Sequence, residues 1–207
     1  VRLVRAVKNR FGSVDEIGIF VMGDKGLEEV KDPAEFFISE RKDDFLPPGI
    51  AYTAVTEGSR TFIVEIQALV VDAKSGYSRV YSDKVDSQRV LRIAAILERH
   101  AAVRLADKDI YINVAGGMKV NEVSAELAIA LALWSASHDI SLPSRMVSFG
   151  ELSLAGEVRP VNYGDRRIKA AAEMGFDKAL VPASMNLDNS RILLKRCQKV
   201  RDAFTFR

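Results

Sequence analysis

The stretch DIYINVAGGMKVNEVSAELAIALALWSASH, residues 109–138, decides the fold class of this chain. Its opening segment, 109–117, predicts a strand that enters a turn at a pair of glycines. Residues 124–138 are almost entirely apolar, so a helix formed here must be buried on most of its sides. A strand followed by a buried helix predicts a domain in which helices pack against a sheet.

The alternation of strands and helices extends upstream of this stretch. Two β-rich runs, 51–57 and 61–71, are separated by Gly58 and Ser59, which predicts a hairpin. After Asp86 the apolar period becomes helical, with one stripe made of Val90, Ile93, Ala94, Leu97 and Ala101. The arginines of this predicted helix fall mostly off the stripe and are expected to be solvated: Arg89, Arg92 and Arg99.

The same alternation continues downstream to the C-terminus. Residues 146–161 predict a strand and a hairpin around Ala155 and Gly156, and residues 165–176 predict an amphipathic helix that ends at Gly175. A strand over 178–183 follows, and then a last strand and a short helix. We therefore expect an α/β (α+β) fold with at least partly mixed strand direction.

The N-terminal quarter has a different pattern. Residues 1–31 alternate apolar and polar side chains, with a hairpin signal at 24–26. Asp32 and Pro33 predict the start of a short helix, and the sequence LPPG at 46–49 ends this unit. We place a boundary here, between residues 1–50 and residues 51–207.

Composition excludes several classes of protein. The 207 residues are 48% hydrophobic, which is enough for a core, and 30 basic against 28 acidic residues leave a net charge of only +2. An anionic partner must therefore be held by a local patch. The one cysteine, Cys197, excludes an internal disulfide and a cysteine-based zinc cluster, and it favours a cytoplasmic location.

Other signals are missing from the sequence. The longest apolar run, 127–134, is far shorter than the roughly 20 residues of a membrane span, so no membrane partner is expected. The phosphate loop GxxxxGK[ST], the HExxH motif and paired CxxC motifs do not occur. The chain is therefore expected neither to hydrolyse ATP nor to hold zinc by itself. Because it begins at Val1, we expect it to be part of a longer protein.

Three motifs carry a resemblance to a known family. KNRFGS at 8–13, NVAGGMKVNEVSAELAIALAL at 113–133 and FGELSLAGEVRPV at 149–161 closely resemble the C-terminal part of the RadA (Sms) family of bacterial recombination and repair ATPases. The resemblance covers essentially the whole chain. It implies that 1–50 is the end of a RecA-type ATPase region and that 51–207 is a Lon-protease-like domain, with the fold of ribosomal protein S5 domain 2.

The resemblance also implies an activity for the whole protein. RadA proteins are similar to hexameric replicative helicases, bind DNA and drive branch migration during homologous recombination. A hexameric ring, a RecA-type recombinase partner, and upstream modules with ATP, Mg and a structural Zn are expected on this basis. For this chain we expect contact with single- and double-stranded DNA and little sequence preference, because no base-reading motif accompanies its cations. The chain itself would supply ring assembly and DNA contact.

The KNRFG cluster has a predicted role within such a ring. Lys8 and Arg10 would reach a nucleotide on the neighbouring subunit and stabilise charge on its γ-phosphate. Their i, i+2 spacing puts both on one face of an extended segment. Asn9 would fix the local backbone, Phe11 would anchor the segment, and Gly12 would permit a turn. The alternative is a solvated loop.

Peptidase activity is not expected from the Lon-like region. Ser124 matches the nucleophilic serine of Lon proteases, but Asn121, Glu122, Val123 and Glu126 replace the Asp, Gly, Pro and Gly around it. Asp165 falls where an ungapped comparison places the general-base lysine, and it is a far weaker base.

Alternatives remain open at this site. Lys169 lies one helical turn beyond Asp165, so a residual Ser–Lys peptidase is one rival function. An Asp165–Lys169 ion pair is the plainer interpretation of that spacing. Ser124 itself has the alternative role of a helix N-cap.

Several cations are candidates for DNA contact. Lys119 is preferred, because the glycine turn before it allows backbone amides and a lysine to approach one phosphate. The other candidates are Arg79, Lys84, Arg89, Arg92, Arg166, Arg167, Lys195, Arg196, Lys199 and Arg201. For each of them the alternative is a solvated surface charge. A purely structural platform is therefore a second rival function.

Four other residues receive plain structural interpretations. His100 and His138 are expected to cap helix ends. Trp134 is expected in the core, and Cys197 is expected to be a lone, partly buried thiol.

Overall fold

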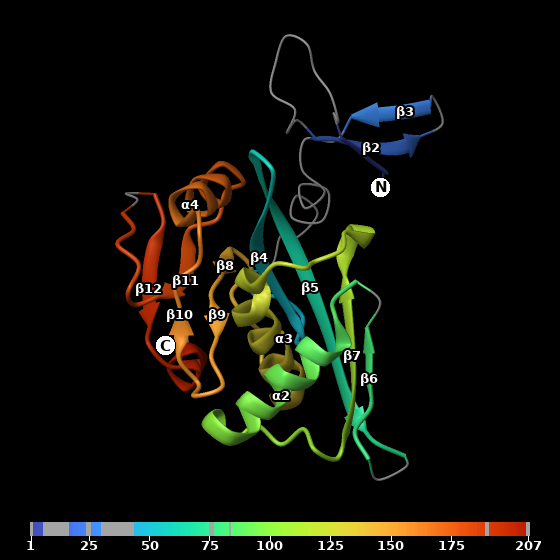
Figure 1. The fold of residues 1–207 in the computed structure, drawn as a ribbon, viewed down its shortest axis with the longest axis vertical. Helices are drawn as coiled ribbons and strands as arrows, with labels where there is room; N and C mark the ends of the chain where they lie inside the picture. The colour runs from blue at the N-terminus through green and yellow to red at the C-terminus, as the bar shows by residue number, and fades with distance from the viewer. Residues whose placement is uncertain are drawn as a thin grey trace.

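A seven-stranded mixed sheet forms the centre of the protein (Figure 1). The computed structural model describes residues 2–5, 17–23, 26–29, 44–74, 77–82, 84–188 and 191–205. In the order of the sheet, the strands are β12 (Leu193–Cys197), β11 (Lys178–Pro182), β8 (Met146–Ser148), β4 (Ile50–Glu57), β5 (Arg60–Asp72), β7 (Lys108–Val114) and β6 (Val80–Ser82).

Strand directions in this sheet are mixed, and β6 at one edge runs parallel to β7. β4, β5 and β7 are antiparallel neighbours, whereas β8, β11 and β12 run parallel to one another. A single residue pair, Tyr52 with Val147, joins β4 to β8. The predicted α/β class with mixed strand direction is confirmed.

Helix α3 (Glu126–His138) supplies the centre of the core. Every residue from Leu127 to Leu133 is completely buried, as the apolar run predicts. The helix packs on β4 and β5, and α2 (Ser87–Ala101) packs on α3, so both helices cover one face of the sheet (Figure 1). The predicted stripe of α2 is confirmed at Val90, Ile93, Ala94 and Leu97, which are buried, and its last member, Ala101, is half-buried against the core.

Two predicted hairpins are also confirmed. β4 and β5 pair up to Glu57 and Arg60 around Gly58, whose φ is +59°. β9 (Glu151–Leu152) and β10 (Val158–Arg159) form the second, around Gly156 at φ +76°. A Cβ on Gly156 would lie 2.6 Å from Cγ of His100, so only glycine fits. The His100 Nε2 atom lies 2.9 Å from the Leu154 carbonyl oxygen, and this contact ties the end of α2 to the hairpin.

The C-terminal region follows the predicted order of elements. Helix α4 (Gly164–Glu173) is followed by Gly175 at φ +83°, the predicted helix end. After β12, the 3-10 helix η3 (Val200–Phe204) brings Phe204 against Trp134, with ring centroids 5.0 Å apart. Trp134 is partly buried against the core. His138 Nδ1 lies 3.0 Å from the Trp134 carbonyl at the end of α3, as expected for a helix-end contact.

A separate antiparallel sheet is made of β1 (Arg2–Arg5), β2 (Ile17–Gly23) and β3 (Gly26–Glu29). It confirms the hairpin predicted at 24–26. The helix predicted after Pro33 lies outside the described residues. Leu46 belongs to the main core, so that core includes residues before position 50. Among the described helices, none has the length and apolarity that a membrane crossing requires.

Candidate functional site

Ser124 lies in a short 3-10 helix, η2 (Val123–Ala125), directly before α3. It is completely buried, and its carbonyl accepts a hydrogen bond from the Gly150 N–H at 2.8 Å. The Leu127 N–H donates in turn to the Gly150 carbonyl at 3.1 Å. The N-cap of α3 is Ala125, without a side-chain bond, so the N-cap alternative for Ser124 is wrong.

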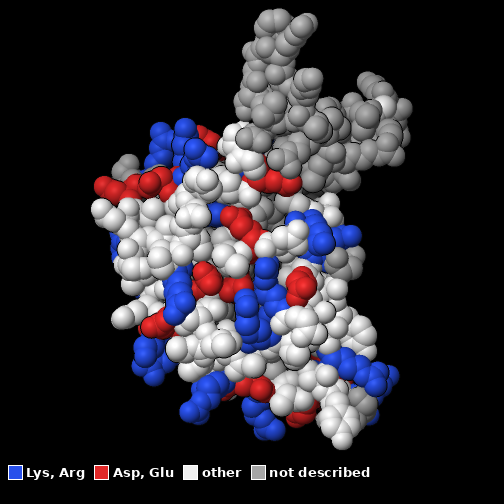
Figure 2. Space-filling view, in the orientation of Figure 1, with Lys and Arg blue, Asp and Glu red and all other residues white. Residues whose placement is uncertain are grey.

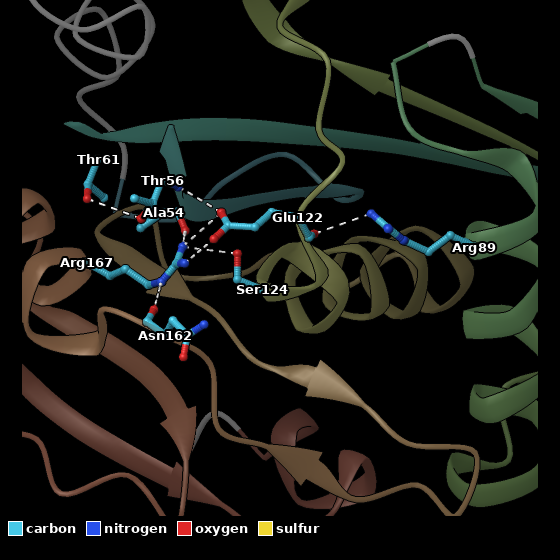
Figure 3. Close-up of polar contacts among 8 residues, drawn as sticks. All are labelled: Ala54, Thr56, Thr61, Arg89, Glu122, Ser124, Asn162 and Arg167. Atoms are coloured by element: carbon cyan, nitrogen blue, oxygen red, sulfur yellow. Dashed lines mark hydrogen bonds and ion pairs between the residues drawn. The ribbon is translucent and has the colours of Figure 1, made fainter. Parts of the chain in front are cut away.

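Arg167 of α4 fills the space in front of the Ser124 hydroxyl (Figure 3). Its guanidinium is completely buried and donates in several directions. Nη1 donates to Ser124 Oγ at 3.1 Å and to the Ala54 carbonyl, and Nε donates to the Asn162 carbonyl at 2.9 Å. One side chain therefore joins α4 to β4, to the segment before α4 and to η2.

Glu122 neutralises this buried guanidinium. Its carboxylate accepts from Arg167 Nη2 and, at 3.2 Å, from Arg167 Nη1, and the Thr56 backbone N–H donates to it at 2.8 Å. The Glu122 carbonyl also accepts from Arg89 Nη1 at 3.4 Å (Figure 3). A buried charge is tolerated only with such a complement of partners.

The helical period explains why Arg167 points inward. Gly164, Arg167, Ile168 and Ala171 form one buried face at i, i+3, i+4 and i+7. Arg167 therefore cannot reach DNA from this position, and its prediction as a DNA contact is wrong. The helical spacing indicates that Arg167 lies on the buried face, but an arginine is most often expected on the solvent side.

Asp165 and Lys169 lie on the exposed side of α4. Lys169 Nζ is 3.9 Å from Glu173, so its ion pair is with this residue instead of the predicted Asp165. The cation that contacts Ser124 is Arg167, two positions beyond the predicted Asp165. A guanidinium stays protonated, so it donates to the hydroxyl and does not accept a proton from it.

A second buried carboxylate, Glu126, lies in the first turn of α3. Its Oε1 pairs with Arg92 and lies 3.6 Å from Arg89 Nε, and the Leu152 N–H donates to its Oε2 at 2.9 Å. Burial raises the pKa of Glu126, which the Leu152 N–H and the two arginines partly oppose. The prediction that Arg89 and Arg92 are solvated is wrong for Arg89, which is mostly buried, and Arg92 is only half-exposed.

Exposed cations gather at the end of the molecule where β4 turns into β5. Lys119 follows the turn formed by Gly116 and Gly117 and borders a cavity of about 330 Å³ with Glu57 and Glu122. On the other side of the hairpin, Arg166 and Lys169 border a cavity of about 290 Å³ with Ser59 and Thr61. Figure 2 shows basic side chains over α4 at this end.

The remaining predicted cations are dispersed. Arg79 is exposed before β6 and interacts with the Tyr81 side chain. Lys195 donates to Thr205, and Arg196 donates to the carbonyls of Met185 and Leu187, so both support the C-terminal segment. Lys84 is partly exposed, and Lys199 and Arg201 are exposed near η3.

The KNRFG residues, Lys8, Asn9, Arg10, Phe11 and Gly12, lie outside the described residues. Within the described part of the chain, no group of three or more His, Cys, Asp or Glu side chains is placed to hold a metal ion.

Several curated proteins with one shared description are similar to this chain. The chain is 49% identical over 188 residues to the DNA repair protein RadA of Treponema pallidum, which covers 91% of this chain and 41% of that protein. It is 44% identical over 187 residues to RadA of Aquifex aeolicus, with 90% and 41% covered. For RadA of Escherichia coli the identity is 44% over 183 residues, with 88% and 39% covered.

These matches cover only part of each relative. The chain spans about two fifths of the length of these relatives. In addition, the family described as subunit ChlI of Mg-chelatase matches residues 82–185, half of the chain, from the end of β6 to the segment after β11.

Proposed function

We propose that this chain, which belongs to the RadA family of DNA repair proteins, is a non-proteolytic, DNA-binding and ring-forming region of an ATP-dependent repair protein. Residues 82–185 also match the family described as subunit ChlI of Mg-chelatase. The observation that carries this proposal is identity of 44–49% over about nine tenths of the chain. We assign residues 51–207 to a Lon-protease-like domain as part of the same proposal.

The surroundings of Ser124 support a non-proteolytic role. A serine nucleophile needs an accessible hydroxyl and a base that takes its proton. Ser124 is buried, and a donor that stays cationic occupies its hydrogen-bonding side. Lys169, the base of the rival Ser–Lys peptidase, lies on the exposed side of α4 beside Glu173. The site has the contacts of a structural junction.

We assign DNA contact to the end of the molecule around the β4–β5 turn. Lys119 and Arg166 are exposed there on the two sides of the hairpin. Backbone groups at the glycine turn next to Lys119 suit a phosphate more than a base edge, so contact would be largely independent of sequence. A modest patch suffices in a ring, because symmetry repeats it in every subunit.

The rest of the activity belongs to the whole repair protein. We propose that Lys8 and Arg10 act on the ATP site of the neighbouring subunit, and that ATP, Mg and a structural Zn bind in parts of the longer protein outside this chain. Branch migration, a RecA-type recombinase partner and a cytoplasmic location complete the proposal. Replacing Arg10 with Ala in the full-length protein should lower DNA-stimulated ATPase turnover; unchanged turnover would remove this role.

A salt series of DNA binding tests the central proposal. Fluorescence anisotropy with single- and double-stranded DNA should show binding that falls by orders of magnitude over a fourfold rise in salt. Lys119→Ala should reduce affinity and lower the salt slope by about 1. Arg104→Ala is the matched control, because Arg104 is an exposed cation beyond the C-terminal end of α2. No binding at low salt would instead favour a purely structural platform.

Active-site labelling tests the rival peptidase. A fluorophosphonate probe should leave Ser124 unmodified in the folded chain, and Ser124→Ala provides the background signal. Specific labelling, or turnover of an unfolded protein that Ser124→Ala abolishes, would overturn the non-proteolytic assignment.

A further inference from the structure

An exposed aromatic surface lies on the β5–β7–β6 part of the sheet, on the side away from α2 and α3. Side chains alternate along a strand, and Ile110 and Ile112, the neighbours of Tyr111, are buried in the core. Tyr111 therefore points to the opposite side of the sheet. It pairs with Leu69 of β5 and with Tyr81 of β6, so three side chains stand in one row. We call this row the tyrosine face.

The tyrosine face is open to solvent and ordered. Leu69 is 56% exposed, Tyr81 41% and Tyr111 39%. The rings of Tyr81 and Tyr111 are stacked, with centroids 4.6 Å apart and planes at 11°. The row borders a shallow cavity of about 680 Å³. Because each tyrosine fixes the orientation of the other, the pair offers a preformed flat surface to a further planar group.

A cation lies at one end of the tyrosine face. Arg79 directly precedes β6, and its carbonyl accepts from the Ile110 N–H at 2.8 Å, so it continues the strand pairing by one position. Its side chain is exposed and interacts with the Tyr81 side chain. A guanidinium has five N–H donors, so donors remain for an oxyanion beside the rings.

The other charges near Arg79 are of both signs. Asp109 lies beside it in the next strand, and its Oδ1 accepts from the Arg79 backbone N–H at 3.1 Å. Lys108 is paired with Asp72. Asp109 is therefore an acidic group that should weaken an anion contact at Arg79, and its removal tests that contact.

Two amides lie on the other side of the tyrosine face. Gln67 and Asn113 are paired across β5 and β7, two positions from Leu69 and Tyr111, and they border the same cavity. The Asn113 Nδ2 atom donates to Gln67 Oε1 at 2.9 Å. A carboxamide has two N–H donors and an oxygen with two lone pairs, so this bond leaves groups that can meet the polar edge of a base.

We propose that the tyrosine face binds single-stranded DNA by base stacking. A base stacks on Tyr81 and Tyr111, and Arg79 pairs with a phosphate next to it. Exposed aromatic rings beside a cation are the anatomy of surfaces that bind single strands with little sequence preference. This inference rests on the DNA-binding clause of the proposed function and adds a contact separate from the cations around the β4–β5 turn.

The chemistry of the tyrosine face favours a single strand over two other partners. Base faces are covered inside duplex DNA and available in a single strand, and a stacking site needs a free face. An apolar protein surface would bury the Arg79 guanidinium without a counter-charge, which is costly. A phosphate beside the rings removes this cost.

Fluorescence anisotropy with an oligothymidylate and with a duplex of the same length is the first test. Tyr111→Ala should weaken binding of the single strand about 5- to 150-fold, the effect of losing one base stack, and should leave duplex binding unchanged. Tyr111→Phe is the matched control, because it keeps the ring, and it should retain the affinity of the unmodified chain. Thermal melts should show that both variants fold. An equal loss of affinity for the duplex in Tyr111→Ala would overturn the stacking mechanism.

The salt dependence of binding separates stacking from charge. Stacking releases no counterions, so Tyr111→Ala should keep the salt slope, whereas Arg79→Ala should lower it by about 0.7, the value for one phosphate of a single strand. Asp109→Asn removes a negative charge beside Arg79 and should raise the affinity. An unchanged slope in Arg79→Ala would overturn the phosphate contact and the proposal with it.

Photochemical cross-linking locates the base directly. An oligonucleotide that contains iodouracil should cross-link to Tyr81 or Tyr111, as mapped by mass spectrometry of the peptides. Cross-links confined to the peptides around Lys119 and Arg166 would overturn the site.

The outcomes separate this inference from the proposed function. An unmodified chain that binds neither form of DNA at low salt would overturn both. Single-strand binding that Tyr111→Ala and Tyr81→Ala leave unchanged would overturn only the stacking site, and Lys119→Ala would still test the contact at the β4–β5 turn. Loss of self-association in the tyrosine variants, with DNA affinity retained, would show that the face binds protein and would also overturn this inference.

Discussion

Replacing Arg167 with Ala should strongly destabilise the protein. The substitution leaves the Thr56 N–H as the donor to the Glu122 carboxylate, and it removes a donor from the Ala54 and Asn162 carbonyls and from Ser124 Oγ. Removing one partner of a buried ion pair costs about 3–5 kcal/mol of unfolding free energy. The Glu122 side chain is 29% exposed and partly hydrated, so we expect the lower end, about 3 kcal/mol.

Differential scanning calorimetry and urea unfolding provide the assay. For a chain of this size, each kcal/mol lowers the melting temperature by about 2–4 °C, so Arg167→Ala should melt about 6–12 °C lower. Arg166→Ala is the matched control, because Arg166 is its exposed neighbour on the same helix, and its change should stay within about 0.5 kcal/mol.

A double variant separates the charge from the packing. Arg167→Met combined with Glu122→Gln removes both charges and keeps most of the buried volume, so it should be more stable than Arg167→Ala. A loss below about 1 kcal/mol in Arg167→Ala would refute the reasoning, since an unpaired carboxylate in this position costs more than that.

Three other substitutions or reactions test separate features. Burial raises the pKa of Glu126 in the folded state, so at a pH above 4.5, the ordinary pKa of a glutamate, the folded carboxyl keeps a proton that the unfolded one has lost. The free energy of unfolding should therefore fall as the pH rises above 4.5. Urea titrations of Glu126→Gln should show no such fall. Burial also raises the pKa of the Cys197 thiol to about 12, so a disulfide reagent should modify it only after unfolding, and rapid modification of the native chain would contradict this. Gly156→Ala should lower the unfolding free energy by about 1–3 kcal/mol, because φ is +76° and His100 occupies the Cβ position; partial recovery in the double variant with His100→Ala, measured by thermal melts, would separate the contact from the backbone strain.

Local patterns in the sequence predict most of the fold. The stripe of α2, the buried run of α3, the hairpin at Gly58 and the helix end at Gly175 each depend on neighbours within a few positions, and all four are confirmed. Such features follow from the helical period, burial and glycine conformations alone. Strand order in the sheet depends on contacts between distant segments, which periodicity does not encode.

The contacts of the candidate site join side chains from segments that lie far apart in the sequence. Glu126 stands out in an apolar run, but its partners Arg89 and Arg92 come from another helix, so only the packing of α2 on α3 reveals them. Arg167 was detectable from its place on the buried face of α4, although its partner Glu122 was not. The tyrosine face likewise exists only once the registers of three strands are known.

The single pair that joins β4 to β8 has a consequence for folding. Each half of the sheet can form from segments close in sequence, but Tyr52 and Ser148, which meet at this seam, are 96 residues apart. Closing so long a loop costs entropy before any contact is gained, and few backbone bonds at the seam offset it. Side chains of α3, which packs on β4, β5 and β8, must supply most of the compensation. We therefore expect the docking of α3 on these strands to be the slow, long-range step in assembling this sheet.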